Sequence, residues 1–230
     1  QGNSEIEYFH EFKFFTGLKD KYVSNSDFKG CTKLRELSLP DNIIQLRWDC
    51  FDGLTNLEVI NIPDTLIRID NANAFRNCNL KTFKANGVIE YIGGAAFMDN
   101  VNLVSCIIPN AILTLIEPYM FRGCKSLKSF DIPSTVTKIG GAAFNSCVSL
   151  KHLSIPESVT EIAYSVFNGC TSMEYFIMNP TTPPSLANAD SFNNTNNCPI
   201  YVPDGSLSAY KSADKWSNHA SRMLPLSLFK

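Results

Sequence analysis

Phenylalanine recurs along most of the chain at a nearly constant interval, and the other apolar positions follow the same period. Successive members of the series lie 23, 24, 22, 24, 23 and 23 residues apart. They are Phe28, Phe51, Phe75, Phe97, Phe121, Phe144 and Phe167. A period of this length is typical of a solenoid, in which no repeat can bury its apolar face alone. The pattern therefore predicts stacked repeats with continuous columns of like side chains, Phe on Phe and Leu on Leu.

Each repeat has the same order of apolar and polar positions after its phenylalanine. The third position holds Cys31, Cys78, Cys124, Cys147 and Cys170, with Leu54 and Asn100 in the two remaining repeats. Leucine usually stands at the sixth position, and two apolar residues then alternate before a proline, as in Leu153-x-Ile155-Pro156. Such alternation predicts a short strand with one buried face, and the proline ends it because it has no N–H to donate.

A second apolar pair follows the proline at a spacing of three residues, as in Val136 and Ile139. The glycines at 140–141 then predict a turn, and the alanines at 142–143 predict one helical turn that leads into the next phenylalanine. These elements together predict a curved, right-handed superhelix that is mainly β. We expect a single parallel ladder of about seven strands, short helical turns and terminal caps.

The N-terminal end of the chain departs from the repeat and is expected to cover one open end of the solenoid, where core residues would otherwise meet water. Residues 3–27 form this predicted N-terminal cap, which is crowded with apolar side chains. They are Phe9, Phe12, Phe14, Phe15 and Leu18. Residues 28–178 hold the seven predicted repeats.

The repeat degrades after residue 178. Residues 179–203 combine a proline-rich and an asparagine-rich loop with a strand-like segment at 200–203, and they predict a degenerate last repeat. Residues 204–230 form the predicted C-terminal capping helix region, in which Ser206 is expected to N-cap a helix that ends near 223–226. The apolar face of this helix consists of Leu207, Tyr210, Ala213 and Trp216.

The repeat unit resembles the BspA-like type of leucine-rich repeat. The likeness is carried by the pattern L-x-x-L-x-I-P…V-x-x-I…A-F-x-x-C, in which proline follows the strand and cysteine precedes it. It covers about residues 28–178, and the segment Ile200-Tyr201-Val202-Pro203 is similar to that family's ending. The resemblance implies a leucine-rich-repeat solenoid, secreted or on the surface of an anaerobic bacterium, that adheres to host or microbial proteins. It brings no catalytic residue.

The charge balance excludes two classes of partner. Lys and Arg number 20 against 22 Asp and Glu, a net charge of −2, so nothing attracts nucleic acid or an anionic membrane surface. No apolar run approaches the ~20 residues that span a bilayer, so we expect no membrane insertion of this segment. The expected location is extracellular or on the cell surface, with lipid anchoring through a removed N-terminal segment as one option. We expect a monomer.

Cysteine and histidine suggest chemistry at first sight, but their placement predicts no catalytic, cofactor-binding or metal site. The cysteine column falls in the core register, so buried thiols without disulfides are the favoured interpretation. Cys106 takes an inward strand position, whereas Cys50 and Cys198 stay undecided. His10, His152 and His219 stand on separate elements, and no nucleophile–base–acid set accompanies them.

Function is expected on the outward positions of the strand ladder, because packing does not dictate their identity. The candidate binding residues are His152, Tyr175, Ile177, Asp131 and Ile107. His152, Tyr175 and Ile177 fall on adjacent rungs, and an exposed tyrosine beside an apolar residue is typical of an interface. The competing interpretation is that the loop at 180–184 folds back over Tyr175 and Ile177, which would make them structural.

Two binding functions remain open at this point. The favoured one is a non-catalytic surface protein that binds a protein, such as a host extracellular protein, through its concave strand face. The alternative is a carbohydrate-binding surface module, which needs exposed aromatic rings beside polar groups. The candidate rings for it are Tyr91, Tyr175 and Trp48, and they do not cluster in the repeat register.

Overall fold

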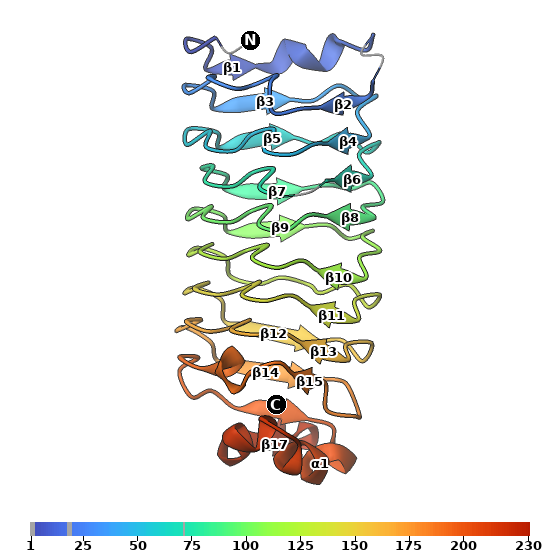
Figure 1. Cartoon of the computed structure of the whole chain (residues 1–230), viewed down its shortest axis with the longest axis vertical. Helices are drawn as coiled ribbons and strands as arrows, with labels where there is room; N and C mark the ends of the chain where they lie inside the picture. Colours follow the sequence, from blue (N-terminus) through green and yellow to red (C-terminus); the bar gives the residue numbers. More distant parts are fainter. Residues whose placement is uncertain (1–2, 18–19, 71) are drawn as a thin grey trace.

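The computed structural model describes residues 3–17, 20–70 and 72–230. The chain forms a parallel-strand solenoid whose turns stack into an upright column, with the first turn at one end and a group of short helices at the other (Figure 1). The predicted architecture, a solenoid built mainly on parallel strands, is confirmed. Leu18, which we placed in the N-terminal cap, lies outside the described residues. The division of the chain into caps and repeats stays a prediction.

The strand that the alternating pattern predicts forms a first ladder along one side of the column. Its members are β1 (Tyr8–Phe9), β3 (Glu36–Ser38), β5 (Val59–Asn61), β7 (Thr82–Lys84), β9 (Ser105–Ile107), β12 (His152–Ile155), β14 (Tyr175–Met178), β16 (Ile200–Val202) and β17 (Met223–Pro225). Neighbours pair in parallel register, so His152 lies beside Tyr175 and Ser154 beside Ile177.

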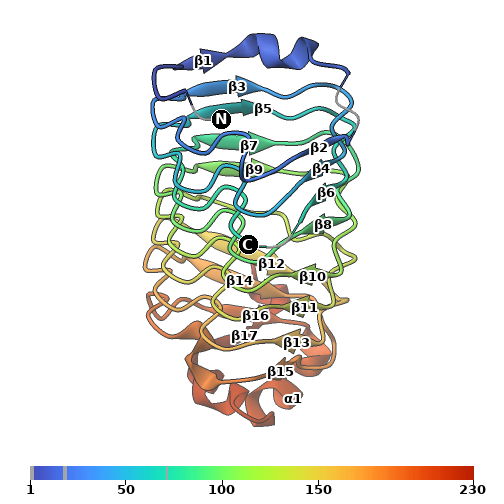
Figure 2. The same cartoon turned by 45° about the horizontal axis from the view of Figure 1, so that its top comes forward.

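A second parallel ladder runs along another side of the column (Figure 2), and the prediction of a single ladder is therefore wrong. Its strands are β2 (Tyr22–Val23), β4 (Gln45–Leu46), β6 (Arg68–Ile69), β8 (Tyr91–Ile92), β10 (Leu115–Ile116), β11 (Lys138–Ile139), β13 (Glu161–Ile162) and β15 (Ser185–Leu186). Each strand ends on the second residue of the apolar pair that follows the proline. Two residues are too few to show an alternating pattern in the sequence.

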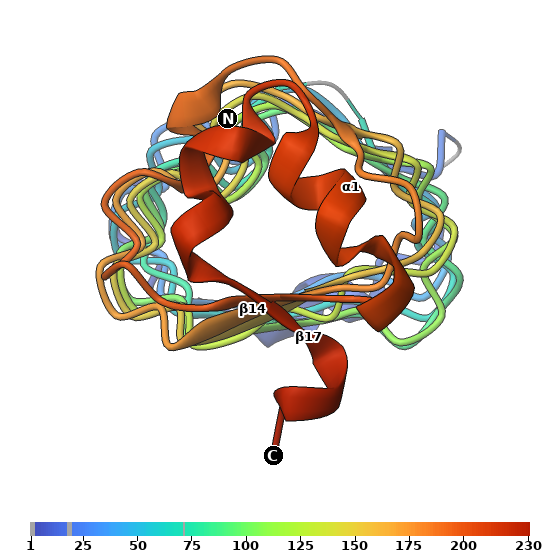
Figure 3. The same ribbon diagram turned by 90° about the horizontal axis from the view of Figure 1, so that it is seen from below.

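The column is nearly straight rather than curved, because the turns overlie one another when it is viewed along its axis (Figure 3). A solenoid curves when the elements on its two sides have different widths. Here both sides carry strands, which stack at the same interval of about 4.8 Å. The predicted concave face is therefore replaced by two nearly flat ladders.

Both ladders are interrupted beside the repeat that is one residue short. The first ladder breaks between β5 and β7, and the second breaks between β8 and β10. The 22-residue repeat lies between two 24-residue repeats and holds β7 and β8, which each keep one partner in register, β9 and β6 respectively. A further break separates β9 from β12, where residues 128–133 form no strand. The repeat length is ordinary there and does not explain it.

Left-handed backbone conformations, rather than helical turns, shape the corners of each rung. The residue two positions after every phenylalanine of the series and after Phe192 has a positive φ; these residues are Gly30, Gly53, Asn77, Asp99, Gly123, Ser146, Gly169 and Asn194. Glycine, asparagine and aspartate tolerate this region best. Ala95 and Ala142 also have a φ of 53°. The helical turn predicted at 142–143 is therefore wrong, because a left-handed residue interrupts it.

The phenylalanine column is continuous through the core, as predicted. Phe75, Phe97 and Phe121 stack with ring centroids 5.5 and 5.4 Å apart and interplanar angles of 3° and 5°. At the N-terminal end, Phe12 of the 3₁₀ helix η1 (His10–Phe14) extends the column onto Phe28 at 5.5 Å. At the other end Phe192 meets Trp216 at 5.1 Å. Aromatic contacts therefore link one end of the molecule to the other.

The cysteine column has a hydrogen-bonding role that the sequence pattern did not reveal. Cys78, Cys124, Cys147 and Cys170 each donate to the carbonyl of the phenylalanine in the preceding repeat, as in Cys124 to Phe97 at 3.0 Å and Cys147 to Phe121 at 3.1 Å. Asn100, which replaces cysteine in one repeat, donates to the equivalent carbonyl of Phe75 at 2.6 Å. A buried side chain that can donate a hydrogen bond thus satisfies a core carbonyl in these repeats, whereas Leu54, at the same position of another repeat, has no donor.

The C-terminal segment covers the last turn and supplies donors to its open carbonyl groups. It comprises η3 (Asp204–Ser206), α1 (Leu207–Ser212), η4 (Trp216–Arg222), β17 and η5 (Leu226–Leu228). The helices before β17 lie over the lower end of the column, whereas the segment after β17 projects away from it (Figure 3). Tyr210 donates to the carbonyl of Pro180 at 2.8 Å, and Trp216 donates to that of Pro184 at 2.7 Å. These side chains take the place of the next rung's backbone N–H groups.

Two details of the predicted C-terminal helix are wrong. The expected single helix is divided into α1 and η4, and residues 223–225 form β17 on the first ladder. The Ser206 side chain makes no capping hydrogen bond and instead donates to the carbonyl of Thr181 at 2.6 Å. Ser206 has helical φ and ψ because η3 precedes it, whereas a capping residue is usually extended.

The first prediction concerns the phenylalanine column. We expect Phe121→Ala to lower the free energy of unfolding by about 3–5 kcal/mol, because it leaves a cavity between two stacked rings. Phe14→Ala, at a side chain that is 72% exposed, should change it by less than about 0.5 kcal/mol. Urea denaturation followed by circular dichroism measures both. Equal effects of the two variants would refute the prediction that the phenylalanine column stabilises the fold.

The second prediction concerns the thiols. We expect no disulfide within the cysteine column, so thiol titration in denaturant without reductant should find all five free, whereas cross-linked pairs in mass spectrometry would contradict this. Burial raises the pKa of Cys170 from 9.0 to about 12. Above pH 9 the unfolded chain ionises thiols that the folded chain keeps protonated. The unfolding free energy should therefore be unaffected by this group below pH 9 and should fall as the pH rises toward 12.

The third prediction concerns the C-terminal cover. Removal of residues 204–230 should cause association and lower the melting temperature, because it exposes Phe192 and leaves the carbonyl groups of the last turn without donors. Size-exclusion chromatography with light scattering and a thermal melt measure both effects. A truncated chain that stays monomeric with an unchanged melting temperature would show that the segment is not a cap.

Candidate functional site

The structure brings His152, Tyr175 and Ile177 together on the first ladder, whereas Ile107 and Asp131 lie in a separate hollow. The His152 and Tyr175 rings are stacked, with centroids 5.3 Å apart and an interplanar angle of 7°. Their order follows from the strand register, which pairs the two residues directly. His152 is exposed, and Tyr175 and Ile177 are half-buried.

Two aromatic residues that the sequence analysis missed complete this cluster. Tyr201 of β16 lies beside Ile177 in the strand register and meets the Tyr175 ring edge-on at 6.4 Å. Phe229, which follows η5, packs on both tyrosine rings, 4.8 Å from Tyr175 and 5.1 Å from Tyr201. Tyr201 could have been found from the register of the degenerate repeat. Phe229 lies outside any repeat, and the sequence gives no signal for it.

The chain's C-terminal tail, and not the proline-rich loop, covers part of the aromatic cluster. The loop at 180–184 leads into β15, which belongs to the second ladder, so it runs away from Tyr175. The expectation that this loop folds over Tyr175 and Ile177 is therefore wrong. The tail is held by a hydrogen bond from the Ser227 N–H to Asp204 Oδ1 at 2.9 Å, and this contact lowers the pKa of Asp204.

Ile107 and Asp131 line a hollow at the break of the first ladder between β9 and β12. Its volume is about 290 Å³, and Ser105, Ser129 and Ser134 line it as well. In the rung between β9 and β12, backbone hydrogen bonds to the preceding rung continue up to Lys128, whose N–H donates to the carbonyl of Val104 at 3.2 Å. Beyond that point residues 129–132 pair with neither flanking strand. Ile107 is 43% exposed and gives the hollow an apolar rim.

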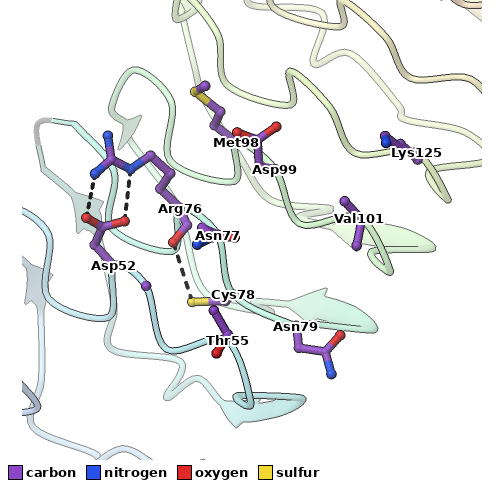
Figure 4. Close-up of a pocket in the computed structure, with 11 residues that line it drawn as sticks. Asp52, Thr55, Arg76, Asn77, Cys78, Asn79, Met98, Asp99, Val101 and Lys125 are labelled. Atoms are coloured by element: carbon purple, nitrogen blue, oxygen red, sulfur yellow. Dashed lines mark hydrogen bonds and ion pairs between the residues drawn. The ribbon is translucent and has the colours of Figure 1, made fainter. Parts of the chain in front are cut away.

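A larger hollow of about 720 Å³ lies at the corner of the rungs, next to the left-handed residues (Figure 4). Arg76 forms two hydrogen bonds to the Asp52 carboxylate, at 2.9 and 2.7 Å, and the carboxylate raises the pKa of Arg76. Met98 and Asp99 lie on the next turn, and Lys125 is more distant (Figure 4). The Arg76–Asp52 pair therefore neutralises its own charge within the hollow.

The second ladder brings together aromatic and charged side chains that the sequence analysis did not group. Its outward column reads Tyr22, Gln45, Arg68 and Tyr91 in direct register. Trp48 lies beside this column and is 61% exposed. Tyr91 belongs to this column, whereas Trp48 lies two residues beyond the end of β4. The expectation that the two rings do not cluster in the repeat register stays a prediction.

The electrostatics of this second face come from paired groups. Arg68 donates to Asp70 Oδ1 at 2.9 Å, and the Gln45 amide donates to the other oxygen of the same carboxylate. Burial raises the pKa of Glu117 and of Tyr91, which share a hydrogen bond. The guanidinium of Arg47 lies over the Tyr22 ring, with its carbon 3.3 Å from the ring centroid.

The cysteines and histidines do not form a reactive centre in the described part of the chain. All eight cysteines are buried and unpaired, including Cys50 and Cys198. Burial lowers the pKa of His219, whose Nε2 lies 2.9 Å from the carbonyl oxygen of Ala189 in the C-terminal cover. Among the described residues, no group of three His, Cys, Asp or Glu side chains could hold a metal ion, and no helix is long and apolar enough to cross a membrane.

Comparison with protein families identifies the repeat. Six copies of the BspA type leucine rich repeat region match the chain, within residues 21–115, 55–174 and 91–213. No curated protein matches the sequence.

Solved structures with the same architecture come from several bacteria. A leucine-rich repeat protein from Bacteroides ovatus is 22% identical with a TM-score of 0.50, over 78% of this chain and 58% of that one. The T. pallidum leucine rich repeat protein is 26% identical, with a TM-score of 0.45 over 69% of this chain and 66% of that one. A leucine rich cell surface protein from Faecalibacterium prausnitzii is 21% identical, with a TM-score of 0.40 and coverages of 68% and 62%. The chain thus spans less than two thirds of each relative's length, and the first likeness shows the fold alone.

Proposed function

Because the chain belongs to the BspA-type leucine-rich repeat family, we propose that it is a secreted or cell-surface binding protein that holds a protein partner on its first strand ladder. The partner class we favour is a host extracellular protein. Tyr175 and Tyr201 lie on a rigid support, since β14 and β16 are each paired with strands on both sides. No step in this function requires catalysis or a cofactor.

The observation that carries the proposal is the aromatic cluster of His152, Tyr175, Tyr201 and Phe229. Tyrosine and other aromatic residues bring a large contact area at a small cost in side-chain entropy, and they are enriched among residues that dominate binding energy. The Tyr175 ring is already held by stacking on His152 and by Phe229, so binding would freeze little additional motion. Ile177 adds an apolar contact beside it.

Ile107 and Asp131 are the outer part of the proposed face, on the two rungs that precede the rung of His152. The unpaired backbone of residues 129–132 offers hydrogen-bond donors and acceptors to an extended segment of a partner. Carbohydrate binding, the second candidate function, is favoured by a different region, the exposed Trp48 on the second ladder.

The fourth prediction tests the aromatic cluster. We expect Tyr175→Ala and His152→Ala each to weaken capture by an immobilised panel of purified host matrix and plasma proteins by tenfold or more. The matched control is Tyr8→Ala, a 50%-exposed tyrosine on the same ladder at the opposite end. Surface plasmon resonance measures capture, and a thermal melt of each variant measures folding.

The result separates a binding role from a structural one. His152 is exposed, so its removal should leave the melting temperature nearly unchanged even though Tyr175→Ala also removes contacts with Phe229. Losses of binding that track losses of stability, or an equal loss in Tyr8→Ala, would make Tyr175 structural and would remove the proposed site.

A further inference from the structure

The hollow beside Trp48 has features that the proposed protein-binding face does not explain. It lies on the second ladder, where β2, β4, β6 and β8 follow one another along the column (Figure 2). Its volume is about 410 Å³, and it is lined by Ser24, Asn25, Gln45, Arg47, Trp48 and Asp70. This volume falls within the range of small-ligand pockets, about 300–1,000 Å³.

Trp48 supplies an aromatic wall. Its side chain is 61% exposed, and within the described residues no aromatic ring stacks on it. The other tryptophan of the chain, Trp216, is buried and donates its N–H to a carbonyl. An indole face that is open to solvent at the rim of a hollow can stack on the apolar C–H face of a sugar ring.

Arg47 supplies a cation whose donors remain available. Its guanidinium lies over the Tyr22 ring, and the side chain is exposed. Among the described residues it forms no ion pair. The nearby carboxylates have other partners, since Asp70 binds Arg68 and Gln45 while Asp27 accepts from Ser24. A guanidinium that has no carboxylate partner within the protein can form two parallel hydrogen bonds to the carboxylate of a ligand.

Polar groups around Arg47 and Trp48 are fixed in position. The Gln45 amide nitrogen is held by Asp70, which leaves its carbonyl oxygen as an acceptor. The Ser24 hydroxyl is anchored to the Asp27 carboxylate at 3.1 Å, and Asn25 is exposed beside it. Donors and acceptors of this kind, at the rim of an aromatic wall, match the hydroxyl groups of a pyranose.

We infer that the hollow beside Trp48 is a binding site for a sugar that carries a carboxylate, of the uronic acid class. The sugar ring stacks on Trp48, its carboxylate binds Arg47, and its hydroxyl groups reach Gln45 and Ser24. A neutral sugar keeps the stacking and loses the ion pair. The inference does not depend on the protein-binding face, which lies on the other ladder.

The test uses the full chain and a pair of ligands that differ only in the carboxylate, methyl β-glucuronide and methyl β-glucoside. The chain has two tryptophans, of which only Trp48 is exposed, so quenching of intrinsic fluorescence reports on this hollow. We expect the glucuronide to bind at least tenfold more tightly than the glucoside. Saturation-transfer NMR on the same pair supplies a second measurement.

Matched variants assign the interaction. Arg47→Gln should weaken glucuronide binding by tenfold or more while leaving the glucoside nearly unchanged, and Arg47→Lys should fall between because it keeps the charge without the two-point geometry. The control is Arg122→Gln, since Arg122 also lies over a tyrosine, 5.8 Å from the Tyr119 ring centroid. Trp48→Ala should abolish the NMR signal of both sugars with the melting temperature unchanged.

Several outcomes would overturn the inference. These are an absence of binding, equal affinity for the two sugars, an equal loss in Arg122→Gln, or competition by triglutamate as strong as by the glucuronide. Tyr175→Ala should not change sugar binding, so failure of this inference and failure of the protein-binding proposal are distinguishable.

Discussion

The structure depends on one constraint, which is that each rung is completed only by the rungs on either side of it. The phenylalanine ring of a rung stacks on its neighbours, and its carbonyl accepts the thiol of the next rung. Stacking and hydrogen bonding thus act at the same place and in the same direction along the column. Asn100 preserves this arrangement with a different donor.

The same constraint explains the chemistry of the C-terminal end. The last rung has carbonyl groups with no following rung to bond them. Side chains of the terminal segment donate hydrogen bonds to these carbonyl groups instead. Arg222 extends this arrangement by donating to the carbonyl of Phe192 at 3.2 Å, which is the bond a thiol makes elsewhere. A terminal cover of this kind is therefore polar in its contacts although it is built from large aromatic residues.

The sequence predicted the features that the same residue type marks in repeat after repeat. It missed features whose sequence signal is short or variable, and contacts that only the tertiary fold creates. The phenylalanine period identified the solenoid, the core columns and the first ladder, because each is repeated several times. The second ladder was not predicted because its strands are only two residues long. The left-handed corners were not predicted because glycine, asparagine, aspartate and serine all occupy the same position. Only part of the candidate site could be predicted. His152 and Tyr175 follow from the strand register, whereas Phe229 contacts Tyr175 only through the tertiary fold.

The buried thiols determine how the protein would respond to oxidation before and after it folds. Thiol–disulfide exchange requires a thiolate, so a folded chain whose thiols have raised pKa values reacts very slowly. An unfolded chain exposes eight cysteines that can pair in many wrong combinations. Folding must therefore finish before oxidation begins, and a molecule that unfolds later can be trapped by mispaired disulfides. Its working lifetime would then be set by how rarely the column opens and not by the equilibrium between folded and unfolded states.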